Sequence, residues 1–139
     1  MIWDPLRKKS VALTPEEGVR QWFIKVLHEE MGIPMHMMMS EVGLKFGADV
    51  GGLAGEKRKE YRADIVVYDR QARPLMVVEC KRPEVDLSRE VLEQALRYNR
   101  VLDVRYVALT NGARTLLFRR EGDSFVPLDH APSWQELIA

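Results

Sequence analysis

Hydrophobic positions recur along the chain with two periods, one typical of helices and one typical of strands. Apolar residues recur every three or four positions across residues 14–31 and 86–102, which predicts two amphipathic helices. Strands are predicted in five segments that alternate between apolar and polar positions or are rich in β-branched and aromatic residues: 35–46, 63–69, 74–80, 104–110 and 114–120. A short hairpin that turns at residues 122–123 and a short capped helix at residues 133–137 are predicted to follow.

The order of these elements predicts the fold class. Helix, three strands, helix and strand follow one another along the chain. This order predicts an α/β (α+β) domain with an αβββαβ core and a mixed central sheet flanked by helices. With 139 residues, the chain is expected to form a single domain. We divide it into an N-terminal arm (1–13), the core (14–120) and a C-terminal hairpin with a short helix (121–139).

The first predicted helix has a clear start and a clear end. Thr14 is its predicted N-cap, and Glu17 stands three positions later, where it completes a capping box. Gly32 follows the last periodic position and ends the helix. The residues before the helix have no clear period, so we expect an extended arm whose Trp3 and Leu6 pack against the body of the domain.

The second predicted helix begins at a cap formed by Asp86 or Ser88. Its apolar stripe is predicted to contain Val91, Ala95, Tyr98 and Leu102. Gln94 borders this stripe and lies on the same helix face as Tyr98. A buried glutamine needs hydrogen-bond partners. Two sets of partners are open: a phosphate or the neighbourhood of Lys81, and backbone groups where the helix meets the sheet.

The segments 63–69 and 74–80 are expected to pair as a β-hairpin, and the register of that pair locates several charges. If the four residues between the strands form the loop, Asp69 faces Pro74 and the numbers of paired residues sum to 143. Asp64 then lies directly opposite Glu79, with Cβ atoms about 5 Å apart. Lys81 lies two residues beyond Glu79 and therefore returns to the same face. Two carboxylates and an ammonium group are thus expected to meet at one edge of the sheet.

Two carboxylates that face each other destabilise a sheet unless a cation lies between them. Mg²⁺ suits this position, because it accepts one or two carboxylates, keeps several waters and completes its shell with phosphate oxygens. Such an ion polarises a phosphoryl oxygen and lowers the pKa of a bound water, while Lys81 would stabilise the developing charge. The alternative is an ordinary salt bridge at the end of a strand, which contributes little to stability.

The charge composition limits how the protein could contact a nucleic acid. The 21 Lys and Arg residues balance the 21 Asp and Glu residues, so the formal net charge is zero. This argues against a protein that coats nucleic acid through bulk charge. A local basic cluster remains close to the expected hairpin: Lys57, Arg58, Lys59 and Arg62. The cluster is either a set of phosphate contacts or the solvated tip of a hairpin.

Other residue types exclude several kinds of site. Cys80 is the only cysteine, so an internal disulfide is impossible, and its strand parity turns it into the core. The three histidines lack the spacing of metal ligands. We find neither a run of about 18 apolar residues nor the apolar core of a signal peptide, so we expect a cytoplasmic protein with no membrane partner.

Several blocks of the sequence together resemble a known enzyme family. Asp64 followed by Glu79, Cys80 and Lys81 resembles the D…ExK signature of the PD-(D/E)xK nuclease superfamily, with Ala63 where many members have proline. Five blocks occur in the order found in small bacterial proteins similar to the N-terminal nuclease domain of type I restriction enzyme R subunits: WDPLRKKSVALTPEEGVRQ, YRADIVVYD, VVECKRP, EQALRYN and YVALTNG. The resemblance covers most of the chain and implies a restriction-endonuclease-like fold.

The resemblance also implies an activity and a role for individual residues. It implies a DNA phosphodiesterase that depends on Mg²⁺, for which Mn²⁺ can substitute. Metal binding would fall to Asp64 and Glu79, with the Cys80 carbonyl as a further ligand, and Lys81 would be catalytic. Gln94 and Tyr98 match a Q-x-x-x-Y element that supports the site and touches DNA in some nuclease branches. In the superfamily an acidic residue of the first helix often touches the metal or its waters, and Glu17 matches it best, with Glu16 as the second choice.

In one respect the chain departs from the R subunits. It contains no G-x-x-x-x-G-K-[ST] element, so ATP-driven translocation is not expected of it. The leading hypothesis is a metal-dependent endonuclease or exonuclease that hydrolyses DNA with a metal-activated water. The alternatives are a catalytically silent DNA-binding or complex-forming module, and an ordinary ion-pair network. The expected partners are DNA and a protein of a restriction or defence system, and a homodimer is possible because type II-like nucleases often act as dimers.

Overall fold

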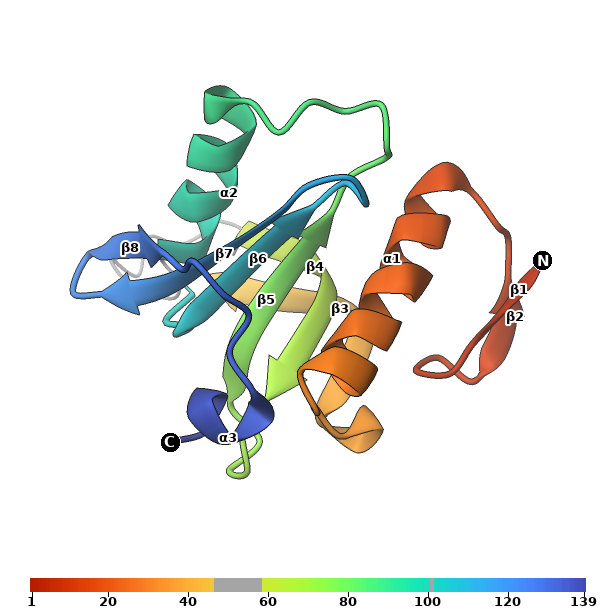
Figure 1. Cartoon of the computed structure of the whole chain (residues 1–139), viewed down its shortest axis with the longest axis horizontal. Helices are drawn as coiled ribbons and strands as arrows, with labels where there is room; N and C mark the ends of the chain where they lie inside the picture. Colours follow the sequence, from red (N-terminus) through yellow and green to blue (C-terminus); the bar gives the residue numbers. More distant parts are fainter. Residues whose placement is uncertain (47–58, 101) are drawn as a thin grey trace, which may run out of the picture.

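The computed structural model describes residues 1–46, 59–100 and 102–139. Its described residues form a twisted six-stranded sheet at the centre of the domain (Figure 1). The strands follow one another across the sheet in chain order: β3 (Met38–Phe46), β4 (Lys59–Tyr68), β5 (Pro74–Cys80), β6 (Tyr106–Thr110), β7 (Thr115–Glu121) and β8 (Ser124–Pro127). Neighbouring strands are antiparallel except β5 and β6, which are parallel and are joined through α2 (Arg89–Arg100). The predicted mixed sheet and αβββαβ core are confirmed.

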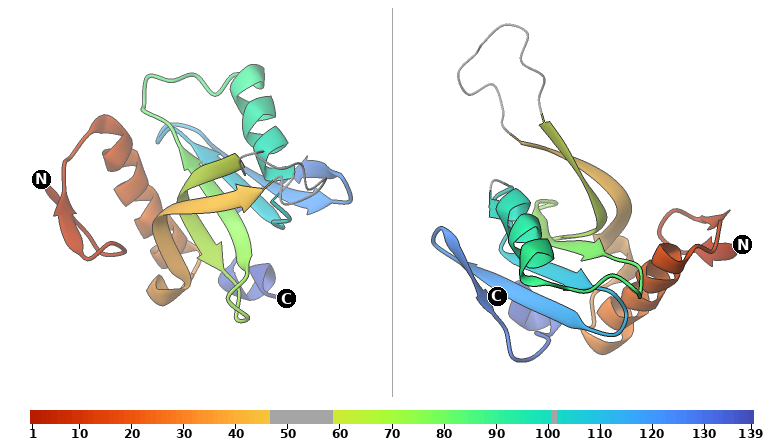
Figure 2. Two further views of the ribbon diagram at one scale, coloured as in Figure 1. Left: turned by 180° about the vertical axis from the view of Figure 1, so that it is seen from behind. Right: turned by 90° about the horizontal axis from the view of Figure 1, so that it is seen from above.

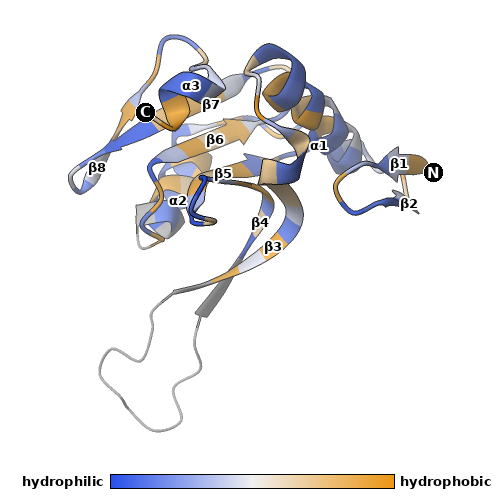
Figure 3. Ribbon diagram, turned by 90° about the horizontal axis from the view of Figure 1, so that it is seen from below, coloured by the Kyte–Doolittle hydropathy of each residue, from blue (hydrophilic) through white to orange (hydrophobic). Residues whose placement is uncertain are grey.

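Helices cover both faces of the sheet, as Figures 1 and 2 show. On one face lie α1 (Pro15–Lys25), its π-helical continuation (Val26–Glu30), a 3₁₀ turn (Met35–Met37) and α3 (Trp134–Leu137). α2 packs on the other face, where its Leu92 and Leu96, and Leu102 after the helix, contact a second apolar cluster. Alternate residues of the central strands contribute to the two clusters, as expected of a sheet buried on both sides. Figure 3 shows hydrophobic residues along β5 and β6, between the helices.

β5 and β6 supply the centre of the core. All five residues of β6 are buried, which confirms the strand predicted from its continuous apolar run. The turn after β6 also forms where it was predicted. Gly112 has a φ of +91°, and the Asn111 side chain accepts hydrogen bonds from the N–H groups of Ala113 and Arg114. None of the helices in the described segments is long and apolar enough to cross a membrane.

The N-terminal residues form a small hairpin and not an extended arm. β1 (Ile2–Asp4) pairs with β2 (Lys9–Val11) beside α1, away from the central sheet (Figure 1). The buried Asp4 side chain organises the turn, because it accepts the N–H of Leu6 and pairs with Arg7. Leu6 packs against the core as predicted, but the prediction for Trp3 is wrong, since 59% of that residue is exposed.

The start of α1 confirms only half of the predicted capping box. The Thr14 hydroxyl accepts a hydrogen bond from the Glu17 N–H at 3.1 Å. The carboxylate of Glu17 does not return to the N-cap, because it accepts hydrogen bonds from Arg7 at 2.7 Å and Gln21 at 2.9 Å. Glu17 therefore connects the N-terminal hairpin to the helix.

The apolar stripe of α2 is rotated from the predicted one. Ser88 caps the helix by accepting the Val91 N–H at 3.3 Å. Ala95 is buried as predicted, but Leu92 and Leu96 stand beside it in the stripe, and Gln94 is exposed. The prediction of a buried Gln94 is therefore wrong. A residue with a small side chain, such as Ala95, fits either stripe, so it could not fix the rotation of the helix.

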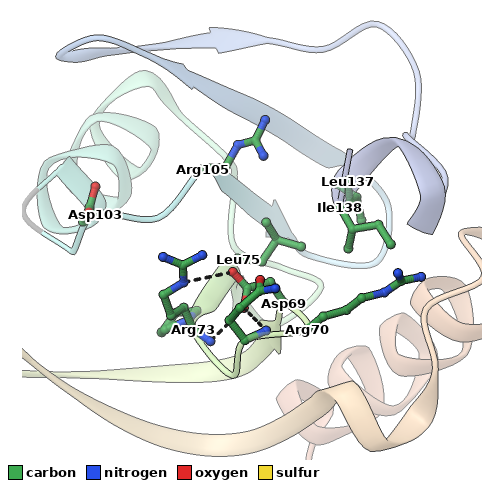
Figure 4. Close-up of a pocket in the computed structure, with 10 residues that line it drawn as sticks. Asp69, Arg70, Arg73, Leu75, Asp103, Arg105, Leu137 and Ile138 are labelled. Atoms are coloured by element: carbon green, nitrogen blue, oxygen red, sulfur yellow. Dashed lines mark hydrogen bonds and ion pairs between the residues drawn. The ribbon is translucent and has the colours of Figure 1, made fainter.

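The loop between β4 and β5 is one residue shorter than predicted. Tyr68 pairs with Pro74, and the Asp69 N–H donates to the Arg73 carbonyl, so residues 70–72 form the loop. Ala72 has a φ of +62°, as the last residue of a three-residue hairpin loop often does. The Asp69 side chain accepts the Arg73 N–H and pairs with its guanidinium (Figure 4). The predicted pairing of Asp69 with Pro74 is wrong.

Candidate active site

A β-bulge restores the predicted register before β4 and β5 reach the candidate site. The pairing shifts by one residue at the loop end, where Leu75 is the extra residue on β5. Beyond it Ile65 pairs with Val78, so the paired numbers sum to 143 as predicted. The same register, continued by one residue, places Asp64 opposite Glu79. Two deviations from the predicted hairpin, a shorter loop and a bulge, therefore cancel.

The Asp64 carboxylate binds the backbone at the end of β5. Its Oδ2 accepts the Cys80 N–H at 2.7 Å. The Lys81 N–H donates to the Thr110 carbonyl on β6, and strand backbones direct alternate residues to opposite sides. The N–H and C=O groups of Cys80 are therefore both turned toward β4 and Asp64. A carboxylate and a carbonyl oxygen from neighbouring strands face the same space.

Burial and neighbouring charges change the acidity of Asp64. Burial raises the pKa of its carboxyl from the usual 3.8 to about 6. The Cys80 N–H and the Arg20 guanidinium oppose this rise, and the negative charges of Glu16 and Glu79 add to it. The repulsion shows that Glu16 and Glu79 both lie within electrostatic reach of Asp64.

Glu79 and Lys81 form the second part of the candidate site. The Lys81 Nζ lies 3.0 Å from Glu79 Oε1, and both side chains are partly accessible to solvent. Lys81 therefore places a positive charge beside the Glu79 carboxylate, on the strand next to Asp64. The structure thus pairs Lys81 with Glu79 and places Glu79 within electrostatic reach of Asp64. The proposed roles of the three residues in metal binding and catalysis stay predictions.

Two charged residues that the sequence reasoning missed complete the surroundings of Asp64. The Arg20 Nη2 lies 2.7 Å from Glu41 Oε1 and 3.4 Å from Asp64 Oδ1. Its Nε lies 3.5 Å from Glu17 Oε2. Burial lowers the pKa of Arg20, but the Glu41 hydrogen bond and the charges of Asp64 and Glu17 outweigh it, so the pKa is raised. A signal for Arg20 did exist, because it shares a helical stripe with Phe23 and Leu27, and a buried arginine requires acidic partners.

Comparison with known proteins identifies the family of this chain. Residues 15–132 match the family described as Type I restriction enzyme R protein N terminus. The chain belongs to this family. It is also 35% identical over 105 residues to the Type I restriction enzyme EcoAI endonuclease subunit of Escherichia coli. That match covers 70% of this chain and 13% of the length of the relative, so this R-protein N-terminal chain corresponds to a small part of a longer protein there.

Solved structures of other proteins share the fold of this chain. A fragment of a candidate HsdR subunit of a type I restriction enzyme from Vibrio vulnificus superposes with a TM-score of 0.62 and 22% identity, covering 92% of this chain and 25% of that one. A candidate nuclease of the DUF820 group from Anabaena variabilis has a TM-score of 0.51 and 11% identity, covering 88% of this chain and 72% of that one. The type IIG restriction endonuclease BpuSI has a TM-score of 0.51 and 19% identity, covering 89% of this chain and 15% of that one. The predicted restriction-endonuclease-like fold is confirmed.

The remaining predicted site residues of this R-protein N-terminal chain lie apart from Asp64 or outside the described parts. Glu17 is buried and bound to Arg7 and Gln21, and it reaches Asp64 only through Arg20. Gln94 is exposed on α2. Arg62 is exposed and donates to the Glu41 carbonyl. Four predicted DNA contacts involve residues or side chains outside the described parts: Lys57, Arg58, Lys59 and Tyr98.

The donor atoms around Asp64 fit a hard divalent cation. Among residues 1–46, 59–100 and 102–139, no three His, Cys, Asp or Glu side chains are grouped so that they could hold a metal ion. Mg²⁺ does not need three such groups, because it binds through one or two carboxylates and keeps several waters. Asp64, Glu79 and the Cys80 carbonyl supply oxygen donors of this kind. The Cys80 thiol is not among them, since it is buried, and burial raises its pKa.

The raised pKa of Asp64 predicts how the stability of the metal-free protein depends on pH. The folded state binds this proton more tightly than the unfolded chain, so the group favours folding below about pH 4, and that contribution is lost as the pH rises to about 6. Relative to Asp64→Asn, we expect the wild type to lose about 2 kcal/mol of unfolding free energy between pH 4 and pH 7. Urea denaturation in EDTA measures this difference. A difference that stays constant with pH would contradict the prediction.

Proposed function

We propose that this protein is a Mg²⁺-dependent DNA nuclease that hydrolyses phosphodiester bonds. One observation carries the proposal: the Asp64 carboxylate accepts the N–H of Cys80, the residue between Glu79 and Lys81, and these two side chains form an ion pair. The family supports it, because the E. coli relative is an endonuclease subunit of a type I restriction enzyme. The reaction class follows from this donor set, since paired carboxylates with an adjacent amine suit metal-assisted phosphoryl chemistry.

Each residue of the proposed site has a separate task. Asp64, Glu79 and the Cys80 carbonyl would hold the ion, because they offer oxygen donors from adjacent strands. When bound, Mg²⁺ or Mn²⁺ would supply Lewis-acid chemistry at the scissile phosphate and acidify a water. Lys81 would stabilise the charge that develops on the phosphoryl oxygens, a role that its fixed position beside Glu79 suits. The Asp64 carboxyl is held in place by the Cys80 N–H and Arg20.

The substrate and the partners are also part of the proposal. We expect DNA to approach the end of β5 where Lys81 is accessible, with contributions from the predicted contacts Arg62, Gln94 and Tyr98. The family suggests that the protein acts with other subunits of a restriction or defence system, since the E. coli relative is itself named as a subunit. A net charge of zero favours local phosphate contacts over binding through bulk charge.

The direct test is a cleavage assay on supercoiled, linear and single-stranded DNA. We expect the purified protein to form product in Mg²⁺ or Mn²⁺ and none in EDTA. Asp64→Asn, purified in the same way, controls for a contaminating nuclease and should give no product. Equal cleavage by the wild type and Asp64→Asn would refute the proposed site.

A second outcome would identify a different function. If the protein binds DNA in EDTA as tightly as in Mg²⁺ and never forms product, it is a catalytically silent DNA-binding or complex-forming module. The zero net charge is the observation that favours this alternative. Comparing DNA binding by the wild type and Glu79→Gln separates the two functions, because a metal-independent module should bind DNA equally well with either residue.

A further inference from the structure

Arg20 lies buried between three carboxylates that come from three different elements of the fold. Glu17 belongs to α1, Glu41 to β3 and Asp64 to β4, and all three lie within 3.5 Å of the Arg20 guanidinium. Only 5% of the Arg20 side chain is exposed. A buried arginine of this kind is strongly held by its acidic partners, and it fixes them in return.

The guanidinium is not saturated by these partners. Nε and Nη1 of Arg20 are buried and have no hydrogen-bond partner in the described parts of the chain. A single nitrogen, Nη2, contacts both Glu41 and Asp64, at 2.7 Å and 3.4 Å. The contact with Asp64 is thus a long electrostatic pairing and not a two-point bond. It leaves the Asp64 carboxylate partly available to a second cation.

Glu41 occupies a special position relative to Asp64. Ser40 pairs with Ile65 and Val42 with Ala63, so Glu41 lies opposite Asp64 across β3 and β4. Glu41 has a φ of +57°, a conformation that non-glycine residues rarely adopt, and the ladder skips this pair. Continued through these positions, the registers of β3, β4 and β5 align three acidic residues across the sheet: Glu41, Asp64 and Glu79.

We propose that Arg20 is a positioning residue that acts as a built-in counter-cation, holding Asp64 and Glu41 together and weakening the binding of a divalent ion at Asp64. The inference rests on the proposed function, because it assumes that Asp64 binds such an ion. Arg20 contacts Oδ1 of Asp64, whereas Oδ2 accepts the N–H of Cys80, the residue between Glu79 and Lys81. An ion bound between Asp64 and Glu79 therefore experiences the positive charge of Arg20 through Asp64.

The number of charges around Asp64 predicts whether each substitution raises or lowers the affinity for a divalent cation. Glu17, Glu41 and Asp64 carry three negative charges, and Arg20 offsets one of them. Replacing Arg20 with glutamine makes the cluster more negative by one charge, so a divalent cation should bind about tenfold more tightly. Replacing Glu41 with glutamine has the opposite effect, since it removes one negative charge and leaves Arg20 to pair only with Asp64 and Glu17. Both substitutions should lower the stability of the metal-free fold.

The experiment is Mn²⁺ binding measured by calorimetry on the full chain without DNA. We expect about tenfold tighter binding by Arg20→Gln and several-fold weaker binding by Glu41→Gln, with Arg20→Lys close to the wild type. Arg7→Gln is the matched control, because Arg7 also pairs with the buried Glu17 but does not contact Asp64. It should lower the thermal stability and leave the Mn²⁺ affinity unchanged. A purely structural role for Arg20 would make both glutamine variants bind Mn²⁺ more weakly.

The possible results separate this inference from the proposed function. If the wild type binds Mn²⁺ and Arg20→Gln binds it equally or more weakly, the counter-cation role is refuted and the nuclease proposal stands. If the wild type does not bind Mn²⁺, the counter-cation role and the nuclease proposal are both refuted. If Arg20→Gln fails to fold, Glu41→Gln still tests the inference, because equal or tighter Mn²⁺ binding by that variant overturns the role of Arg20.

Discussion

Replacing Lys81 with methionine is expected to lower the rate of DNA cleavage by about 10²- to 10³-fold, the usual cost of removing one fixed charge donor from a transition state. Lys81 Nζ lies 3.0 Å from Glu79 Oε1 and is partly accessible to solvent. Methionine keeps a similar stem length and packing. Single-turnover rates at saturating Mg²⁺ measure the effect. Binding of the divalent ion should not weaken, because the substitution removes a positive charge from its surroundings.

A matched substitution on another strand controls for the loss of a positive charge from the sheet. Arg119 on β7 forms an exposed pair with Glu121 at 2.6 Å. Arg119→Met should therefore cleave DNA at close to the wild-type rate. If Lys81→Met retained more than about a fifth of the wild-type rate, Lys81 would have no catalytic role, since even a weak transition-state contact contributes more than that.

Replacing Phe23 with alanine is expected to have the largest effect on stability. Phe23 lies on the inner face of α1, is 1% exposed and belongs to the core cluster beneath that helix. Loss of the ring leaves a cavity that the helix and sheet cannot close, which costs about 3–5 kcal/mol of unfolding free energy. Urea denaturation at constant pH measures the change. Because the variant should unfold at lower urea concentrations, it should also lose divalent-ion binding at lower urea concentrations than the wild type.

The neighbouring residue on α1 supplies the control for Phe23→Ala. Trp22 contacts the Phe23 ring at a centroid distance of 5.8 Å, but 42% of it is exposed. Trp22→Ala should therefore cost about 1 kcal/mol, because little of its surface loses contact with the core. Similar losses for the two variants would mean that α1 is not anchored on the sheet by its Phe23 face.

The arrangement of the sheet could be predicted because its central strands have simple patterns. β6 reads as one continuous apolar run and is buried along its whole length. The hairpin of β4 and β5 reads as two apolar runs around a polar loop. The alternation of side chains along β5 was enough to predict that Cys80 is buried. The predicted register next to Asp64 is correct, although the predicted loop length is wrong. A three-residue loop and a bulge at Leu75 together give the same sum of paired residue numbers as a four-residue loop.

The charged surroundings of Asp64 could not be predicted in the same way. Arg20 meets Glu41 and Asp64 from a distant part of the chain, and these contacts depend on how α1 crosses the sheet. No local sequence pattern predicts how this helix crosses the sheet. The exposed Gln94 has a similar cause, since a rotation of α2 by a fraction of a turn moves a residue from the edge of the stripe into solvent. The N-terminal hairpin depends on Asp4, whose turn-forming role is visible only once its partners are placed.

The bulge at Leu75 lies at the far end of the hairpin from Asp64, yet it sets which residue stands opposite that carboxylate. Side chains on neighbouring strands stay aligned only while the count of residues between them is preserved. Inserting or deleting one residue at the hairpin tip would slide β5 by one step and bring Val78 or Cys80 opposite Asp64 in place of Glu79. A change at the hairpin tip would thus disrupt the proposed site from a distance, although every residue of the site would still be present in the sequence.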